Sequence, residues 1–397
     1  MLLRSTLAFA ALSLTSASSS ATTRVVNLER LPNEKLAQLA PALQSGPIAL
    51  VESNSDGTMK QVSIFMFVRA KPETVHDVIG HPVDYKKFIR NMSKSDWEVR
   101  PDGTNVSTWQ LELPVSAFDG INVYNFLPGE GGKPGPIELH AIDPNDDATY
   151  RWEMIPVQGG TVLVQYGYTD VVHSNKLVRS FVKRQATMEH GLALAAQLIM
   201  VAPMKTESEK RTPAGSLESL PAAAAPSFSF LLQRGQVAVM HSGPKSNTFG
   251  DISISDRVFA SKEKILEAVG HPALYSSFIP GVKNSNARFE GHNVIYTMDL
   301  SVPLVSWNTT YLMSPSPTGF AGVGTDGDLQ GARFAWDVVP KTPNDALLVY
   351  RVSQSLSQSS FVLRKLFQFD PSLEYGLNVA FGLVYVRAMR GRAEGWK

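Results

Sequence analysis

Two histidines stand in nearly the same surroundings, and a recurring histidine is the first residue to consider for acid–base or metal chemistry. His81 lies in the stretch IGHPVDYKKFI and His271 in the stretch VGHPALYSSFI. In both stretches the histidine stands between a glycine and a proline, where one short helix is predicted to end and the next to begin. No second histidine accompanies both copies at a constant spacing. We therefore expect each histidine to satisfy a turn, with no catalytic and no metal-binding role.

The same stretches carry large side chains at helical spacing. Tyr275, Phe278 and Ile279 stand at i, i+3 and i+4, which places them on one face of a short helix. Tyr85 and Phe88 repeat the pattern in the first stretch. We interpret these residues as packing residues that hold the short helix over the mouth of a sheet.

The repetition extends over most of the chain. LQSGPIALVES matches LQRGQVAVMHS, YRWEMIP matches FAWDVVP, and MEHGLALAA matches LEYGLNVAF, all in the same order and at offsets of 184 to 190 residues. Two copies with so long a period predict tandem globular domains. The Ala-, Ser- and Pro-rich segment between them predicts a linker. The predicted division is a signal peptide at 1–21, a first domain at 40–205, a linker at 206–228 and a second domain at 229–392.

The composition is that of an ordinary globular protein. Of 397 residues, 43% are hydrophobic and 18% are charged, and 37 Lys and Arg face 36 Asp and Glu. A net charge of +1 argues against a nucleic-acid partner, because phosphate binding needs a basic surface. The chain has no cysteine, which excludes disulfides, thiol catalysis and thiolate metal sites. We expect no cofactor.

The N-terminus predicts export. Arg4 precedes an apolar run that reaches Leu14, and small residues follow up to Ala21. This order is typical of a secretory signal peptide, and the run is too short to remain as a membrane anchor. We expect cleavage after about Ala21 and a periplasmic or secreted protein.

Each copy repeats one order of predicted elements. Two strands come first, then the two short helices around the histidine, then about five alternating strands. A long apolar helix closes each copy, from Lys176 to about Met204 and from Phe361 to about Met389. This order predicts an α+β helix-grip domain, duplicated in tandem, in which a curved antiparallel sheet surrounds the long C-terminal helix.

The motif resembles the START-like (SRPBCC) superfamily, which includes the birch-pollen allergen, polyketide cyclases and coenzyme Q-binding START proteins. Those proteins commonly read Tyr-x-x-Phe-hydrophobic-Pro in the second short helix, with a serine in the strand that follows. The second copy matches at Tyr275, Phe278, Ile279, Pro280 and Ser285, and the first at Tyr85, Phe88, Ile89 and Ser95, with Arg90 in place of the proline. The resemblance implies the fold and leaves the ligand open.

An apolar stripe on each long helix predicts the binding site. The stripe is the seam between helix and sheet, and Gly191 and Gly376 beside it suggest a seam that does not close completely. An unfilled apolar interior is where a hydrophobic ligand binds. The predicted pocket residues are Met188, Leu192, Ala195, Ala196, Ile199 and Trp152 in the first copy, and Leu373, Leu377, Ala380, Phe381, Val384 and Trp336 in the second.

The chain lacks HExxH, GxSxG and glycine-rich phosphate motifs. Acidic residues shared by the copies fall in alternating strands or near the long helix, where they are expected to face water. We therefore predict a protein that binds or transports a hydrophobic molecule, such as a lipid, sterol, quinone or polyketide, with transient membrane contact. Two alternatives stay open: a polyketide cyclase/dehydratase-type enzyme using the same pocket, and a non-catalytic interaction module with one degenerate copy.

Overall fold

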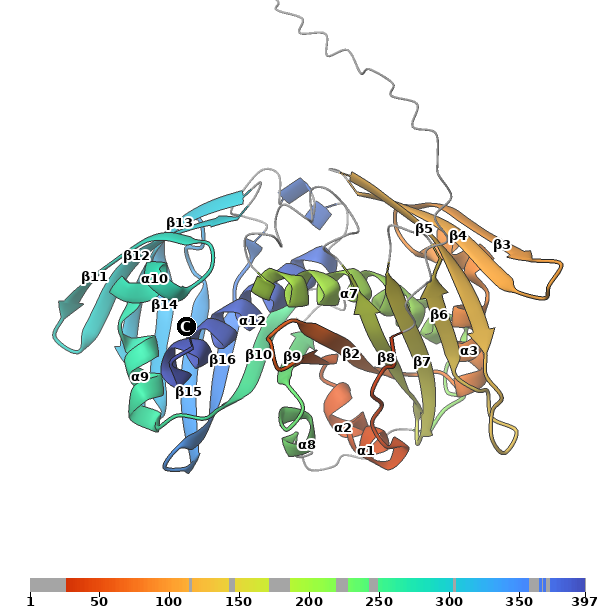
Figure 1. The fold of residues 1–397 in the computed structure, drawn as a ribbon, viewed down its shortest axis with the longest axis horizontal. Helices are drawn as coiled ribbons and strands as arrows, with labels where there is room; N and C mark the ends of the chain where they lie inside the picture. The colour runs from red at the N-terminus through yellow and green to blue at the C-terminus, as the bar shows by residue number, and fades with distance from the viewer. Residues whose placement is uncertain are drawn as a thin grey trace, which may run out of the picture.

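Two halves of the chain with the same order of elements lie side by side (Figure 1). The computed structural model describes residues 26–113, 116–142, 147–170, 186–218, 228–242, 249–302, 305–356, 364–365, 367–368 and 372–396. The predicted signal peptide, residues 1–21, lies outside this part of the chain. Within the described residues, no helix is both long enough and apolar enough to cross a membrane.

The first copy opens with short helices and closes with one long helix. Its elements are α1 (Asn33–Gln38), α2 (Ala40–Leu43), β1 (Ile48–Ser53), β2 (Met59–Val68), α3 (Pro72–Gly80), η1 (Pro82–Asp84), α4 (Tyr85–Phe88), β3 (Met92–Val99), β4 (Asn105–Leu113), β5 (Ser116–Phe126), β6 (Ile137–Ala141), β7 (Ala148–Val157), β8 (Gly160–Thr169) and α7 (Ala186–Arg211).

The second copy repeats this order. Its elements are α8 (Ser229–Leu232), β9 (Gln236–Ser242), β10 (Phe249–Val258), α9 (Lys262–Gly270), η2 (Pro272–Leu274), α10 (Tyr275–Phe278), β11 (Val282–Glu290), β12 (Asn293–Val302), β13 (Val305–Pro315), β14 (Gly319–Gly327), β15 (Arg333–Thr342), β16 (Asp345–Ser353) and α12 (Ser372–Glu394). In both copies a curved antiparallel sheet surrounds the long helix, which is the predicted helix-grip fold.

The two sheets join into one. The strand order is β11-β12-β13-β14-β15-β16-β10-β9-β1-β2-β8-β7-β6-β5-β4-β3, and the antiparallel pair β9–β1 connects the copies. Ala49 pairs with Ala238, its own equivalent in the repeat, so the junction has a local two-fold axis. The repeat predicts two separate domains; the structure shows one continuous sheet, although each strand stays within its own copy.

The long helices pack against each other across the same axis (Figure 1). A Cβ added to Gly191 would lie 2.3 Å from the Cβ of Ala380, and one added to Gly376 would lie 2.6 Å from the Cβ of Ala195. Such distances are too short for real carbon atoms, so glycine is required at both positions. The small residues therefore let α7 and α12 touch. This corrects the interpretation that they leave space for a ligand.

The outer face of the sheet differs between the copies. In β2 nearly every residue is buried, because α7 covers one face and the α1–α2 pair covers the other. Leu36, Leu39 and Leu231 form part of this outer layer. In β10 only alternate residues, such as Ile252 and Ile254, are buried. The apolar run of β2 is continuous because this strand is buried on both faces. Apolar and polar residues alternate in β10 because that strand is buried on one face.

The short-helix motif has a structural role in both copies. The hydroxyl of Tyr85 donates to the carbonyl oxygen of Ile79 at 2.6 Å, and that of Tyr275 donates to Val269 at 2.5 Å. The hydroxyls of Ser95 and Ser285 donate to the carbonyl oxygens of Pro82 and Pro272, which begin the preceding 3₁₀ turns. The tyrosine bonds connect α4 and α10 to the preceding helices α3 and α9, and the serine bonds connect the 3₁₀ turns to β3 and β11.

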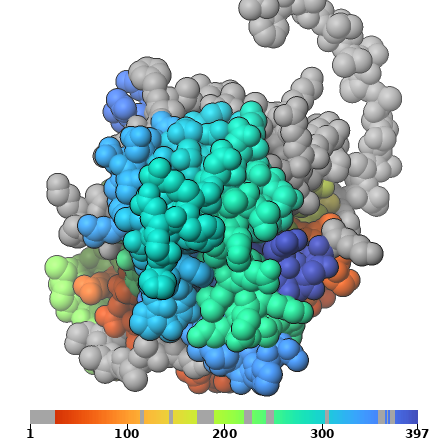
Figure 2. Space-filling view, turned by 90° about the vertical axis from the view of Figure 1, so that its left-hand side faces the viewer, coloured from red at the N-terminus to blue at the C-terminus, as the bar shows by residue number. Residues whose placement is uncertain are grey.

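The long helices extend beyond their predicted ends. The apolar period of α7 stops near Met204, but the helix continues to Arg211, into the segment predicted as a linker. Polar contacts hold these last turns: the Lys205 ammonium donates to the carbonyl oxygen of Phe67 at 2.7 Å, and Arg211 pairs with Asp77 at 3.0 Å. In the second copy, the end of α12 reaches the surface beside α9 (Figure 2).

Candidate ligand-binding site

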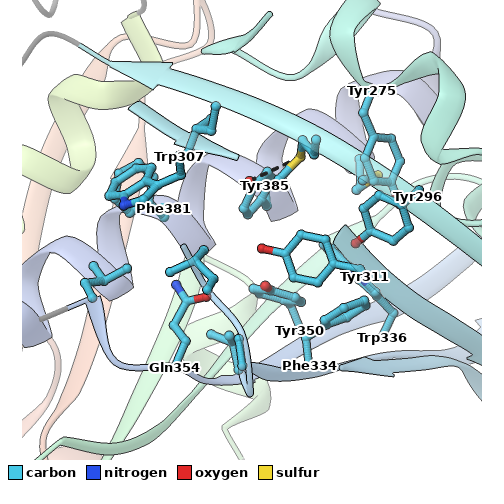
Figure 3. A pocket seen from close by; sticks show the side chains of 17 residues that line it. Tyr275, Tyr296, Trp307, Tyr311, Phe334, Trp336, Tyr350, Gln354, Phe381 and Tyr385 are labelled. Atoms are coloured by element: carbon cyan, nitrogen blue, oxygen red, sulfur yellow. Dashed lines mark hydrogen bonds between the residues drawn. The ribbon is translucent and has the colours of Figure 1, made fainter. Parts of the chain in front are cut away.

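A cavity of about 40 Å³ lies in the second copy, between the inner face of the sheet and α12 (Figure 3). Strands β12, β13, β15 and β16 and helices α10 and α12 supply most of its lining. Most of that lining is aromatic: Tyr275, Tyr296, Trp307, Tyr311, Phe334, Trp336, Tyr350, Phe381 and Tyr385. A space of this size holds roughly three water molecules.

The aromatic rings contact one another around the cavity. Tyr296 and Tyr311 stack with their centroids 5.0 Å apart, and Trp336 lies 4.3 Å from Tyr350. Trp307 meets Phe381 of α12 edge-on at 4.9 Å. Such offset and edge-to-face contacts are the favoured geometries for aromatic pairs. The rings form a continuous aromatic wall around the cavity.

Several polar atoms point into this space. Figure 3 shows the hydroxyls of Tyr296, Tyr311 and Tyr350 directed toward the same region. Among the described residues, the buried indole N–H of Trp307 has no hydrogen-bond partner. The Gln354 amide donates to the side chain of Asn378 at 2.8 Å. The cavity is therefore mostly apolar with a few polar groups, as ligand sites usually are.

Burial keeps the cavity phenols neutral. It raises the pKa of Tyr350 above its usual value, and neighbouring phenols raise it further. The pKa values of Tyr296 and Tyr385 are raised by the same causes. A phenol that stays protonated donates a hydrogen bond and does not act as a base. The tyrosines can orient a carbonyl or hydroxyl oxygen of a ligand.

The predicted pocket residues of the second copy separate into groups. Trp336 and Phe381 line the cavity. Ala380 lies at the contact with α7, while Val384 is buried in the core and Leu377 is half-buried beside it. The side chain of Leu373 lies outside the described part of the structure.

In the first copy the predicted residues are more scattered. Trp152 and Ile199 are buried in the core, and Leu192 is half-buried against it. Ala195 lies at the helix contact, and Ala196 is exposed. The side chain of Met188 lies outside the described residues.

Sequence reasoning missed the tyrosines of the sheet. Tyr296 lies in a strand where it alternates with Met298 and Leu300, a pattern that marks one buried face. That pattern identifies core positions, but it does not separate cavity lining from closed packing. The signal available was the difference between copies: the paired strands place Ser107 at the position of Tyr296.

The histidines behave as predicted for a turn. The Nδ1 atom of His81 lies 2.8 Å from the carbonyl oxygen of Asp77, and that of His271 lies 2.9 Å from the carbonyl oxygen of Glu267. Each histidine is exposed and ends the helix before it. The described part of the chain contains no cluster of His, Asp and Glu able to hold a metal ion.

Comparisons with known proteins concern the fold. No family model and no curated protein matches the chain. The di-domain ARO/CYC BexL of the BE-7585A biosynthetic pathway is 13% identical, with a TM-score of 0.32, and the match covers 85% of this chain and 98% of that one. A START superfamily protein from Mycobacterium smegmatis is 20% identical, with a TM-score of 0.29, over 37% of this chain and 99% of that one. The duplicated helix-grip arrangement itself is established by the elements and the strand pairing of this chain.

Proposed function

We propose that the protein binds a hydrophobic small molecule in the cavity of the second copy, between its sheet and α12. The observation that carries this proposal is the position of the cavity in the grip of the fold, with an aromatic lining and an indole N–H that lacks a partner among the described residues. Apolar burial supplies the affinity in such a site, and the few polar atoms set the orientation of the ligand.

The lining favours a ligand with flat rings. Tyr311, Tyr350 and Trp336 offer ring faces and edges, which stabilise a flat conjugated guest more than a plain acyl chain. The protonated phenols donate hydrogen bonds to oxygen atoms on that guest. A quinone or an aromatic polyketide has both properties. A role as an exported carrier of such a molecule, with transient membrane contact, is part of the same proposal.

A ligand of this size requires the cavity to widen. The cavity of about 40 Å³ is far smaller than the roughly 300–1,000 Å³ of a typical ligand pocket. The side chains of Phe381 and Tyr385 come from α12, so movement of these two rings away from the sheet enlarges the space. Binding is therefore expected to change the fluorescence of Trp307, which contacts Phe381.

Native mass spectrometry of the full-length protein from its own host tests this proposal. We expect an added mass that disappears after extraction with organic solvent. The extracted protein should then bind N-phenyl-1-naphthylamine, a neutral fluorescent probe with flat rings. Neither an added mass nor any probe binding would contradict the proposal.

Two variants locate the site. Ala332→Leu places extra carbon atoms at the cavity wall and should weaken probe binding at least tenfold. Ala335→Leu is the matched control, because it makes the same change three positions along on the opposite face of β15. Melting temperatures of both variants show whether lost binding reflects lost folding.

Phe381→Ala tests the site in the opposite direction. It gives the second copy the residue type that Ala196 supplies in the first, and it enlarges the cavity. Loss of a buried phenyl ring typically costs about 3–5 kcal/mol of stability. We expect lower stability together with tighter binding of the probe, which a closed core would not show.

A further inference from the structure

The interior of the first copy contains buried amide groups without partners. Gln197 on α7 is 1% exposed and Gln165 on β8 is 3% exposed. Among the residues that the structure describes, neither amide atom of Gln197 has a hydrogen-bond partner, and nor has the carbonyl oxygen of Gln165. Buried polar groups in folded proteins are nearly always bonded to protein, water or ligand. These three atoms therefore need a partner inside the first copy.

The amide groups lie between the inner face of the sheet and the long helix. Gln165 follows Leu163 by two positions in β8, so both point to the core side of the sheet. A Cβ added to Gly167, two positions further on, would lie 2.7 Å from Nε2 of Gln197. The Gln197 side chain thus rests on the strand that carries Gln165, where the absence of a side chain on Gly167 makes room for it.

A fourth polar atom comes from the other arm of the curved sheet. Among the described residues, the buried Nε1 of Trp109 on β4 also lacks a partner. The indole ring of Trp109 lies over Gly120 of the neighbouring strand, and a Cβ added to Gly120 would lie 2.8 Å from this ring. The interior of the first copy therefore presents unsatisfied donors and acceptors from β4, β8 and α7.

The second copy does not repeat this arrangement. Gln165 pairs with Trp152, and in the second copy Tyr350 pairs with the equivalent tryptophan, Trp336. Aligning the two long helices at Gly191 and Gly376 places Gly382 of the second copy at the position of Gln197. Gly382 packs against isoleucine side chains of β10. The polar atoms are thus particular to the first copy and are not demanded by the shared fold.

We propose that the first copy is a second binding site, for a compact neutral molecule that carries a hydrogen-bond donor and acceptor side by side, as a carboxamide does. The amide of Gln197 presents a donor and an acceptor in one plane, and another carboxamide complements both at once. The inner face around it carries Leu163, Trp152 and Met154, none of which is charged. A charged ligand would lose its hydration there without an ionic partner. This site does not depend on the cavity of the second copy.

Binding of 2-aminobenzamide, a small fluorescent aromatic carboxamide, to the full-length protein tests the inference. We expect one molecule to bind per chain. Gln197→Met keeps the shape of the side chain and removes the amide, and it should weaken binding at least tenfold. Because the variant also removes an unpartnered buried group, its melting temperature should stay the same or rise. Gln165→Met should weaken binding in the same direction.

Gln110→Leu is the control, because it removes an amide from the neighbouring position of β4, which points to the other face of that strand. It should leave 2-aminobenzamide binding unchanged. No binding to the wild type, or equal binding to Gln197→Met, would overturn the inference. A higher melting temperature with unchanged binding would show that water alone satisfies the amides. Binding of N-phenyl-1-naphthylamine to Gln197→Met reports separately on the second copy.

Discussion

The two copies share their framework but differ in what fills the space between sheet and helix. Where the second copy places phenols, the first places smaller or more polar side chains. The equivalent positions, taken from the strand pairing, are Ser107 for Tyr296, Asn122 for Tyr311 and Gln165 for Tyr350. On the long helix, Ala196 stands where the second copy has Phe381.

The contacts that the copies share are those that build the scaffold. The tyrosine bonds to the carbonyl before each helix break, made by Tyr85 and Tyr275, are nearly identical. The contact of α7 with α12 uses equivalent glycines and alanines on both sides. The described residues that fill the space between sheet and helix in one copy do not pack against their equivalents in the other copy. One fold can therefore hold an aromatic cavity in one copy and buried amides in the other.

Among changes to the shared scaffold, the largest loss of stability is expected from breaking the contact between the copies. Ala380→Phe forces a ring against Gly191, and Ala195→Phe does the same against Gly376. Because the helices already touch, each change should destabilise the protein by about 3 kcal/mol. Urea unfolding measures the loss, and Thr206→Phe, at an exposed position of α7, is the control. Equal stability of all three variants would contradict the close contact.

A buried carboxylate should give the second copy a pH dependence at a position where the first copy has no ionisable side chain. Asp256 pairs with Arg390 at 3.0 Å, and burial raises the pKa of this carboxyl to about 6 from 3.8. The equivalent residue of the first copy is Met66. Since the folded state then binds a proton more readily than the unfolded state, its contribution to stability rises as the pH falls from about 6 to 4.

The variant Asp256→Met isolates this effect, because it gives the second copy the residue of the first. We measure the free energy of unfolding of both proteins between pH 4 and pH 7. In wild type, the titration of Asp256 should lower this free energy by up to about 1.4 kcal/mol for each unit of rising pH, and the variant should lack this contribution. Parallel pH curves for the two proteins would show that Asp256 does not titrate in this range.

The hydrogen bonds of the shared tyrosines should stabilise both copies to a similar extent. Tyr85→Phe and Tyr275→Phe each leave a buried carbonyl oxygen, at Ile79 and Val269, without its donor. We expect each to lower stability by about 1–2 kcal/mol. Equilibrium unfolding of the two variants checks this. A large effect in one copy and none in the other would show that the motif has different roles.

The smallest effect is expected at the histidines. His81→Ala and His271→Ala remove exposed side chains that only end a helix. Each should change stability by less than about 0.5 kcal/mol and leave the binding of both probes unchanged. A lost probe affinity in either variant would contradict the structural role.

The sequence predicted the framework well, because its signals are local. The order of strands and helices in each copy, the break at Gly80–Pro82 and the apolar period of the long helices each follow from burial and backbone geometry. The matched segments also identified the repeat. The joining of the sheets at Ala49 and Ala238 could not be predicted, because an edge strand that pairs has the same pattern as one covered in another way.

The site was only partly predictable. Trp336 and Phe381 line the cavity, as the apolar stripe and the matched tryptophans indicated. Gly376 was interpreted as leaving room, but a small residue on a helix fits a close helix contact equally well, and only the position of Ala195 decides between them. The strand pairing places Asn122, and not the nearby Tyr124, at the position of Tyr311.

The most direct test is native mass spectrometry of the wild-type protein with both probes present. Two copies with one scaffold and different interiors should form a ternary complex that carries one N-phenyl-1-naphthylamine and one 2-aminobenzamide. Ala332→Leu should lose only the first probe, and Gln197→Met only the second. Complexes with a single probe at a time, or a variant that loses both probes while remaining folded, would contradict two separate sites.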